Sequence, residues 1–406
     1  MRVLIVIAGC GALLAACERR SDKYCMLHPT DLAFCERSDA PSDAPMMCTS
    51  NAECSAADPY CEPSAHICVE CLTSADCATH PGEPQCNPTT FACQGCLVHT
   101  DCASGACLPE GTCGDESNVI YVSDQGLDTN PCTAAAPCKT IAHAITLLTQ
   151  TRQYIKLSGA LVESATILAK RATFLADPGT TLTGTADPTL KLQKSELRIY
   201  DLAVTCPAAP AIGGIKSEME STTTLVNVTI RGCGHKGLEG KGGYLRVNRS
   251  TVAQNLEGGI VLDGMADFSI TNTFIYLNGK PDVVAGGVMI GATTSGINQF
   301  EFNTVVQNIG KVVGGVTCPT TNGMPAKNNL IVENSPANTV GCDFSASIVA
   351  PDITPYDFLG ANNYHLGANS EAIDKVTATS SVSDDVDAQY RPIGAAKDFG
   401  ADEYKP

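Results

Sequence analysis

Two arginines and two aspartates have the types and spacing best suited to chemistry in this sequence. Arg246, Arg249, Asp263 and Asp267 could converge if the chain returns beside itself about once in two dozen residues. A basic side chain can remove a proton next to a carboxylate, and paired carboxylates can hydrolyse a glycosidic bond. Solvent-facing charges of a structural protein would give the same pattern, and we favour that interpretation.

A short acidic run near the C-terminus is a candidate calcium site. Asp384, Asp385 and Asp387 offer the oxygens that a hard cation prefers, although no glycine-centred loop of the EF-hand type surrounds them. The alternative, which we favour, buries Arg391 against one of these carboxylates or against Asp402, because an arginine fork matches a carboxylate with two hydrogen bonds. Apart from calcium, the sequence predicts no cofactor.

The composition narrows the range of partners. The chain has 26 basic and 43 acidic residues and a net charge of −17, which argues against nucleic acid and anionic membrane surfaces. It also argues against polyanionic substrates unless a divalent cation bridges them. Sugar-binding platforms favour aromatic rings, but the chain has no tryptophan. Tyr244 and Tyr276 are candidates for exposed rings, although we expect both to pack inward.

The segment from Ser195 to Asn334 repeats one short phrase. The phrases share one aliphatic column and, in four of the five, a closing asparagine: Ile230, Val252, Ile275, Val305 and Ile331, and Asn255, Asn278, Asn308 and Asn334. Strands this short cannot bury an apolar side alone, so the repeat predicts a solenoid of stacked parallel strands. The asparagines are expected at turns, hydrogen-bonded to their copies in neighbouring coils. An ordinary β-sandwich is the alternative.

Two cysteine pairs provide a test of this register. Cys206 and Cys233 are one coil apart, and so are Cys318 and Cys342. Neighbouring strands lie about 4.8 Å apart, within the Cα separation of about 4.4–6.8 Å that a disulfide needs. We therefore predict disulfides between coils. Cys132 and Cys138 flank a turn and are expected to pair locally.

Residues 48–114 contain a different repeat, of three cysteine-rich units. Each unit has four cysteines, and the units adjoin through C-x-x-C steps: 48, 54, 61, 68; 71, 77, 86, 93; and 96, 102, 107, 113. Zinc is one interpretation, but His66, His80 and His99 keep no constant offset, so we expect disulfides, with three connectivities open for each unit. The spacing resembles that of cysteine-rich tandem repeats in secreted bacterial proteins.

The first residues have the features of an export signal. Arg2 precedes an apolar run, and Leu14-Ala15-Ala16-Cys17 resembles a bacterial lipoprotein cleavage box. Residues 1–16 would be the signal peptide, Cys17 the lipidated N-terminus, and residues 17–47 a flexible polar tether. A signal peptide without lipidation is the alternative. We expect an exported protein attached to the outer membrane by its lipid, on the cell surface or the periplasmic face.

The start of the solenoid resembles a known family. Residues 119–123 alternate as a strand, and Ile141, Ile145 and Leu148 share one helical face. The sequence YVSDQGLDTNPCTAAAPCKTIAHAI resembles the opening of right-handed parallel β-helix proteins of the pectin-lyase-like superfamily. The resemblance implies an N-terminal helix that covers the first coil of a domain spanning residues 118–349. The superfamily includes polysaccharide lyases and hydrolases. His143 lies on the expected helix, and we expect it to be structural.

Residues 350–406 resemble the choice-of-anchor Q domain of bacterial surface proteins. The resemblance rests on Tyr364-His365-Leu366, Ser370-Glu371-Ala372-Ile373-Asp374, Asp384 to Asp387, Arg391-Pro392 and Asp398 to Tyr404. Glu371 replaces the proline that is usual in that family, and Lys375-Val376 also depart from the pattern. The resemblance implies a C-terminal cap on the solenoid.

These features predict an all-β fold, a right-handed parallel β-helix (solenoid) with an N-terminal capping helix, preceded by small disulfide-rich modules. We expect a cell-envelope lipoprotein that serves attachment, recognition or display without catalysis. A glycan or a surface protein would be the partner. The alternative is a polysaccharide lyase or glycoside hydrolase acting on an extracellular glycan.

Overall fold

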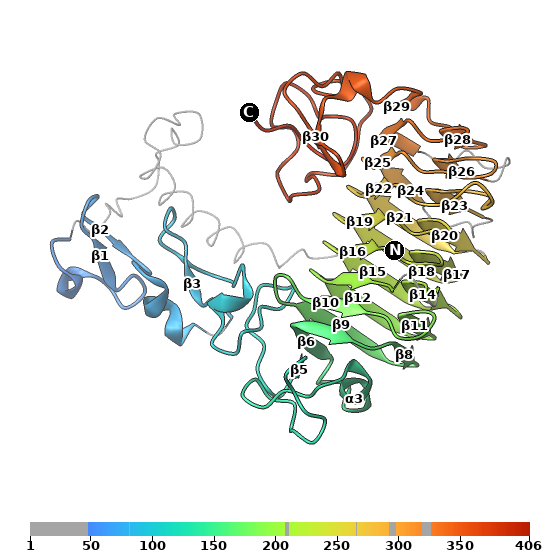
Figure 1. Cartoon of the computed structure of the whole chain (residues 1–406). Helices are drawn as coiled ribbons and strands as arrows, with labels where there is room; N and C mark the ends of the chain where they lie inside the picture. Colours follow the sequence, from blue (N-terminus) through green and yellow to red (C-terminus); the bar gives the residue numbers. More distant parts are fainter. Residues whose placement is uncertain (1–47, 81, 208–210, 265, 292–297, 319–325) are drawn as a thin grey trace, which may run out of the picture. The chain divides into compact units, whose positions relative to one another are not determined.

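The computed structural model describes residues 48–406 except 81, 208–210, 265, 292–297 and 319–325 (Figure 1). The predicted signal peptide (1–16), the lipidated Cys17 and the tether (17–47) lie outside the described residues. The chain divides into two compact units, Met1–Gly114 and Asp115–Pro406. None of the helices in the described part of the chain has the length and hydrophobicity that a membrane crossing needs.

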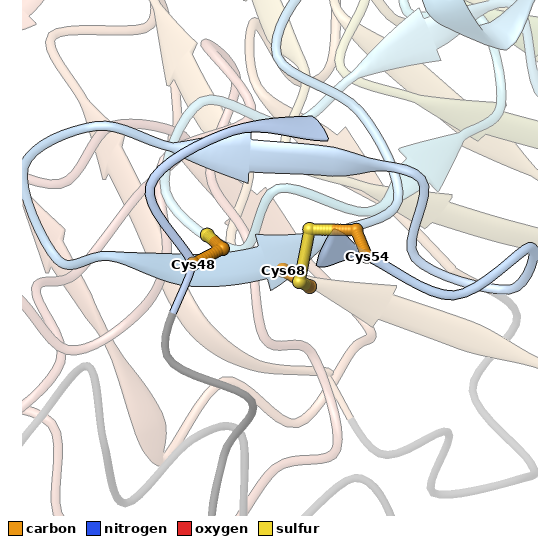
Figure 2. Close-up of side chains that lie close together, drawn as sticks. All are labelled: Cys48, Cys54 and Cys68. Carbon is orange, nitrogen blue, oxygen red and sulfur yellow. A yellow bond between two sulfur atoms is a disulfide. The ribbon is translucent and has the colours of Figure 1, made fainter. Parts of the chain in front are cut away.

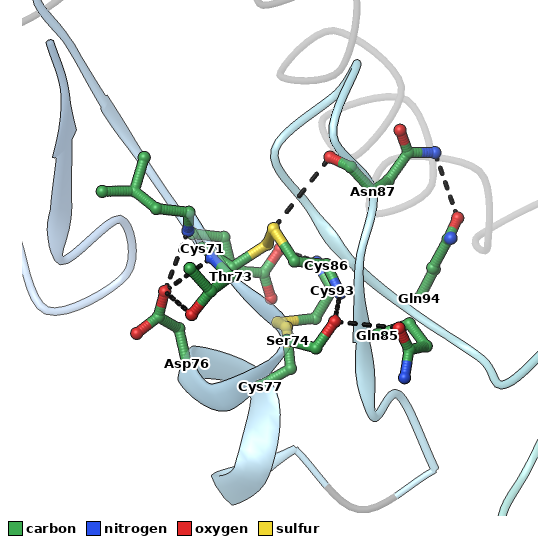
Figure 3. Close-up of a disulfide and its surroundings, with 12 residues drawn as sticks. Cys71, Thr73, Ser74, Asp76, Cys77, Gln85, Cys86, Asn87, Cys93 and Gln94 are labelled. Carbon is green, nitrogen blue, oxygen red and sulfur yellow. Dashed lines mark hydrogen bonds between the residues drawn. A yellow bond between two sulfur atoms is a disulfide. The ribbon is translucent and has the colours of Figure 1, made fainter. Parts of the chain in front are cut away.

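The first unit contains the three cysteine-rich modules. Their short elements are η1 (Asn51–Glu53), β1 (Tyr60–Glu62), β2 (Ile67–Val69), η2 (Ser74–Thr79), β3 (Gln85–Cys86), β4 (Cys93–Gln94) and η3 (His99–Asp101). β1 pairs with β2 and β3 with β4, both antiparallel. In each module a carboxylate accepts at least one backbone N–H near the first cysteine: Glu53 from Thr49, Asp76 from Leu72 and Thr73, and Asp101 from Leu97 and Val98. Figure 3 shows Asp76 beside Thr73.

All three modules share one disulfide connectivity, first to third and second to fourth. The pairs are Cys48–Cys61 and Cys54–Cys68, Cys71–Cys86 and Cys77–Cys93, and Cys96–Cys107 and Cys102–Cys113. Figure 2 shows the bridge between Cys54 and Cys68 next to Cys48. Because all twelve cysteines of the described modules are bonded to sulfur, none of them offers a thiolate to zinc.

The second unit is a right-handed parallel β-helix, which confirms the predicted fold class. One sheet has eight parallel strands, β8 (Ala165–Leu168), β11 (Leu190–Gln193), β14 (Ile215–Glu218), β17 (Leu238–Lys241), β20 (Ile260–Asp263), β23 (Val288–Ile290), β26 (Val316–Thr317) and β28 (Thr339–Val340). Each coil of the solenoid supplies one strand to this sheet. The other sheet consists of two rows that meet at a bend.

The first row is β5 (Val119–Ser123), β6 (Tyr154–Ser158), β9 (Arg171–Ala176), β12 (Glu196–Tyr200), β15 (Thr222–Val226), β18 (Tyr244–Asn248), β21 (Asp267–Thr271) and β24 (Gln299–Glu301). The second row is β7 (Ala160–Val162), β10 (Thr181–Thr183), β13 (Ala203–Thr205), β16 (Thr229–Arg231), β19 (Thr251–Ala253), β22 (Phe274–Tyr276) and β25 (Thr304–Val306). β27 (Ala326–Val332) pairs with both β24 and β25, and β29 (Ala346–Ala350) follows it. Figure 1 shows these strands stacked coil upon coil.

Like residues stack along the axis of the solenoid. Ile230, Val252, Ile275, Val305 and Ile331 pair in register on successive coils and are all fully buried. Three coils also share a Gly-Gly step before an aliphatic residue, at Gly258-Gly259-Ile260, Gly286-Gly287-Val288 and Gly314-Gly315-Val316, and these steps have a steric reason. A Cβ atom at Gly259 would lie 2.7 Å from the carbonyl oxygen of Gly287 and 2.9 Å from Nδ2 of Asn278, so a side chain there would push the coils apart.

The asparagines form a buried ladder at the turns that follow β19, β22, β25 and β27. Asn255, Asn278, Asn308 and Asn334 each donate through Nδ2, the first three to Oδ1 of the next asparagine at 2.9 Å. The residue before each asparagine is left-handed, with φ of 53° to 58°. A second ladder, which the sequence analysis did not predict, runs through Thr273, Asn303 and Asn329 at the preceding turn.

Three disulfides tie the solenoid together. Cys206–Cys233 and Cys318–Cys342 join adjacent coils with Cα separations of 4.6 and 5.0 Å, close to the spacing of neighbouring strands. Cys132–Cys138 closes a short local loop. α3 (Ile141–Thr146) covers the first coils and buries Ile141, Ala144 and Ile145 in the solenoid core. His143, also on α3, is partly exposed.

Residues 350–406 lie along the side of the solenoid. They contain η4 (Thr354–Tyr356) and the antiparallel pair β30 (Phe358–Gly360) and β31 (Asn363–Leu366). Their apolar side chains form one cluster with outward-facing residues of β22, β25 and β27, including Phe274, Val306 and Leu330. Val349, on the last paired strand, is 41% exposed. The apolar surface that this region covers is therefore a lateral one, and its role as a C-terminal cap stays a prediction.

Arg391 connects several segments of the C-terminal region to one another. Its guanidinium is fully buried and pairs with Glu403 at 2.9 Å, and it donates to the carbonyl oxygens of Asp384 and Gly400 at 2.8 and 2.9 Å. It also lies 4.5 Å from the centre of the Phe302 ring of the solenoid. Burial of Arg391 agrees with the favoured alternative of the sequence analysis, but its carboxylate partner is Glu403 and neither Asp402 nor the acidic run.

Candidate functional site

A polar groove of about 480 Å³ lies between the solenoid and the C-terminal region. The solenoid wall comes from the ends of β18, β21 and β24 and the turn after β18, and the opposite wall from residues 381–390. The solenoid residues that line it are Arg246, Asn248, Arg249, Ser269, Thr271 and Gln299. Asp384 and Tyr390 belong to the opposite wall. We call this feature the groove.

The parallel register places the polar side chains of the solenoid wall in files. Arg246, Ser269 and Gln299 stand in register on three successive strands, and Asn248 stands beside Thr271. Strand alternation points these residues outward and buries Leu245 and Val247. The hydroxyl of Ser269 donates to Oε1 of Gln299 at 2.9 Å, and that of Thr271 to Oδ1 of Asn248 at 2.9 Å. Hydroxyl and amide groups thus repeat along the groove at the coil spacing.

Arg246 and Tyr390 are both exposed in the groove. Arg246 lies on the outer side of β18 and makes no ion pair or hydrogen bond with the described part of the chain. Tyr390 is 83% exposed on the opposite wall. A cation and an aromatic ring are thus both open to solvent at the two sides of one groove.

Arg249 and Asp384 connect the two walls. Nη1 of Arg249 lies 3.6 Å from Oδ2 of Asp384. Oδ1 of Asp384 accepts a hydrogen bond of 3.1 Å from Nδ2 of the fully buried Asn272, at the turn after β21. These contacts dock the turn of residues 381–390 on the solenoid.

The structure separates the four residues that the sequence analysis grouped. Arg246 and Arg249 share the groove, but Asp267 stands in register with Tyr244 at the far end of β18 and β21, and Asp263 ends β20 in the other sheet. The predicted convergence is wrong for both aspartates, because β20 and β21 face different sides of the coil. The groove lining contains Asp384 as its carboxylate.

The two tyrosines singled out from the sequence are only partly exposed. Tyr244 and Tyr276 are both half-buried, and the ring of Tyr276 packs 4.7 Å from that of Tyr364. Burial raises the pKa of Tyr276. Neither residue lines the groove.

The acidic run has a different partner for each carboxylate. Asp384 faces Arg249 and Asn272, Asp387 lies 3.1 Å from Nε2 of His365, and the buried Asp385 accepts from the backbone N–H groups of Asp387, Gln389 and Glu403 at 2.7 to 3.1 Å. Burial raises the pKa of Asp385 despite these hydrogen bonds. These contacts account for the three carboxylates without a cation, and calcium binding here stays a prediction.

A second, smaller hollow of about 270 Å³ lies over the eight-stranded sheet. Asp187 reaches across one coil to His235, whose Nδ1 lies 3.1 Å from its Oδ2, and it also accepts from the backbone N–H of the intervening Gly213 at 2.7 Å. Nearby, Lys216 lies between Glu218 at 3.2 Å and Glu239 at 3.6 Å. This network was not predicted from the sequence, since Asp187 and His235 are two coils apart.

Hydrogen bonds dominate the electrostatics of Glu218 in this network. Burial alone would raise its pKa, but hydrogen bonds from Gln193, Lys191 and Lys216 outweigh burial and lower the pKa to about 2. The lysines of the hollow are thus already paired with carboxylates. The groove, with its unpaired Arg246, is the better candidate for binding a ligand.

Comparisons with known proteins give a single solved structure. No family model and no curated protein matches this sequence. The crystal structure of a pectate lyase, Pel9A, aligns with a TM-score of 0.35 and 14% sequence identity, over 72% of this chain and 98% of that one. The fold itself is established here by the register of the parallel strands.

Proposed function

We propose that this protein is an exported surface lipoprotein that binds an acidic glycan in the groove without turning it over. The observation that carries the proposal is the unpaired Arg246 in a groove lined by hydroxyl and amide groups. A lipid on Cys17 would hold the protein to the outer membrane, on the cell surface or the periplasmic face, and residues 18–47 would give it reach. A surface protein is the other partner class in keeping with this role.

The charge of the groove favours an anionic group on the ligand. The whole chain has a net charge of −17, whereas the described lining of the groove holds two arginines and the carboxylate of Asp384, which already faces Arg249. A guanidinium binds carboxylate or sulfate through two parallel hydrogen bonds. A glycan with such groups would therefore be attracted locally despite the acidic surface around it.

The spacing of the solenoid wall suits an extended chain. Arg246, Ser269 and Gln299 repeat once per coil, a rise of about 4.8 Å that is similar to the length of one sugar unit. Tyr390 adds an exposed ring on the opposite wall, where an aromatic face could stack against a sugar. Together these groups offer charge, hydrogen bonds and an apolar face, which are the three kinds of contact that sugars use.

The carboxylates argue against hydrolysis at this place. A glycosidase needs two carboxyl groups within about 10 Å across the scissile bond. Asp384 is the carboxylate of the described lining, and Asp263 and Asp267 lie outside the groove. We therefore propose that the groove binds a glycan and does not hydrolyse it.

Titration with matched oligosaccharides tests the proposal. The purified full-length protein would be titrated by calorimetry with a tetramer of galacturonate, a sulfated tetramer and a neutral galactose tetramer, each with and without calcium. We expect binding of an acidic tetramer that weakens with salt, no binding of the neutral one, and unchanged ligand afterwards. Equal binding of all three, or of none, would remove the basis for an acidic-glycan site.

A polysaccharide lyase is the second candidate, and Arg246 is the observation that favours it. An exposed guanidinium can pair with the carboxylate of a uronate and so acidify the neighbouring C–H, whose proton a second group would then remove. The same titration separates the two functions, because elimination leaves an unsaturated product that absorbs in the ultraviolet. Accumulation of that product, with loss of it in Arg246→Gln, would establish the enzyme.

A further inference from the structure

One of the two arginines of the groove is already engaged by an acid of the chain itself. Nη1 of Arg249 faces Oδ2 of Asp384 at 3.6 Å, with 27% and 33% of the two side chains exposed. Charge-assisted hydrogen bonds are shorter, about 2.7–2.9 Å. The pair is thus a loose contact that remains open to the groove, and an arginine in it keeps donors to spare.

Polar atoms around this contact are left without partners. Nε of Arg249, Oδ1 of Asn272 and Oε1 of Gln389 are buried and form no hydrogen bond. Asn272 also holds Asp384, and Gln389 belongs to the same turn as Asp384. Buried polar atoms without partners destabilise the arrangement that buries them. The polar contacts of residues 381–390 at this point are therefore less complete than those inside the C-terminal region, where the guanidinium of Arg391 meets one carboxylate and four carbonyl oxygens.

The backbone of Arg249 supports a use for its side chain. Arg249 has φ of 50°, and the residues at the same turn of neighbouring coils, Asn227 and Asn272, have φ of 54° and 49°. Asparagine tolerates this left-handed region better than arginine does. Arg249 thus combines a left-handed backbone with an unpartnered Nε, and its known contact is the loose one with Asp384.

We propose that Asp384 is a built-in competitor for the ligand of the groove. In the free protein Asp384 takes the guanidinium of Arg249, and the carboxylate or sulfate of a bound glycan displaces it. The incoming group gains two short hydrogen bonds where Asp384 has one long contact, and the turn of residues 381–390 is released from the solenoid at that point. The proposal rests on the acidic-glycan function above.

The competition sets a threshold for binding. A ligand that must first displace Asp384 has its apparent affinity reduced by the fraction of protein in which Arg249 is free. A weakly anionic or singly bonded group would not overcome this reduction. An anion that forms two parallel hydrogen bonds with the guanidinium of Arg249 would overcome it.

Removal of one charge, with a second removal as control, tests the proposal. Asp384→Asn keeps the shape of the side chain and its contact with Asn272. Asp387→Asn removes the same charge three residues away, where the partner is His365. Both variants and the parent protein would be titrated with inorganic sulfate and with the galacturonate and sulfated tetramers, and their thermal midpoints compared to show that each is folded.

We expect Asp384→Asn to bind the anionic probes about threefold to tenfold more tightly than the parent protein. Asp387→Asn should bind as the parent does, and Arg249→Gln added to Asp384→Asn should abolish the gain. Equal tightening by both single variants would reduce the effect to net charge and overturn the competition. Weaker binding by Asp384→Asn alone would make Asp384 a ligand contact instead. Failure of the parent and all variants to bind would overturn the proposed function itself.

Discussion

Asn278 receives two hydrogen bonds from Asn255 of the preceding coil through a single oxygen. Its Oδ1 accepts from the backbone N–H of Asn255 at 3.1 Å and from Nδ2 of Asn255 at 2.9 Å. Its own Nδ2 donates to the carbonyl oxygen of Val252 at 2.8 Å and to Oδ1 of Asn308 at 2.9 Å. Since all four residues are fully buried, this one side chain satisfies polar groups that water cannot reach.

Asn278→Ala should destabilise the solenoid strongly. The substitution leaves the buried backbone N–H of Asn255 without its partner and removes the hydrogen bonds of Asn278 to Nδ2 of Asn255 and to the carbonyl oxygen of Val252, and we expect a loss of about 2–4 kcal/mol in the free energy of unfolding. Urea unfolding followed by circular dichroism measures it. Asn369→Ala, at an exposed position, is the control and should change little. An equal, small effect at both positions would contradict a structural role for the ladder.

Arg391→Met should destabilise the interior of the C-terminal region. The change leaves Glu403 charged, buried and unpaired, which typically costs about 3–5 kcal/mol. Faster proteolysis within residues 350–406, with the solenoid intact, is the expected result. The double variant Arg391→Met/Glu403→Gln should recover part of the resistance, since the buried charge is gone. No recovery would mean that the carbonyl contacts of Arg391, and not its ion pair, hold the region.

The repeat in the sequence made the solenoid predictable, but no pattern in the sequence predicted the groove. Val252 and Ile275 occupy the same place in phrases about two dozen residues apart, and that period alone places them one above the other. Tyr390 and Asp384 reach the groove only because residues 350–406 pack on the side of β22, β25 and β27. That docking depends on the shape of a lateral apolar surface, which leaves no period in the sequence.

The sequence predicted the kind of partner that a buried charge has, but not which residue it is. An arginine near several acidic residues indicates a buried ion pair, and Arg391 forms one. The sequence cannot rank Glu403 above Asp402, because both follow the arginine within one short turn-rich segment. The convergence of Asp263 with Arg246 failed for a similar reason, since the number of residues between two strands does not state which side of the coil each strand faces.

The C-terminal region should be more stable at mildly acidic pH. Burial raises the pKa of Asp398 to about 6, above the value of about 3.9 in an unfolded chain. The folded state then binds more protons between about pH 4 and pH 6, so its stability falls as the pH rises through this window. Asp398→Asn should reduce this dependence in urea unfolding from pH 4 to 7, and the exposed Asp282→Asn should not. The remainder is due to Asp402, whose pKa burial also raises to about 6. A parent protein that gains stability as the pH rises over this range would contradict the shift.

The solenoid should show the opposite dependence at lower pH through Glu218. Its folded pKa of about 2 lies below the ordinary 4.5, so the stability it contributes is present above about pH 4.5 and is lost as the pH falls toward 2. Glu218→Gln should remove part of the acid sensitivity, measured as the midpoint of acid unfolding. Glu220→Gln, at an exposed position two residues away, provides the comparison and should leave that midpoint unchanged.

Binding of an acidic tetramer by Arg246→Gln tests the central claim most directly, because Arg246 is the unpaired cation of the groove. Arg198→Gln is the matched control, since Arg198 is exposed on the same row of strands two coils away. We predict at least about tenfold weaker binding for Arg246→Gln, from the loss of a charged hydrogen bond, and unchanged binding for Arg198→Gln. Parent-like binding by Arg246→Gln, or equal weakening in both variants, would contradict a glycan site in the groove.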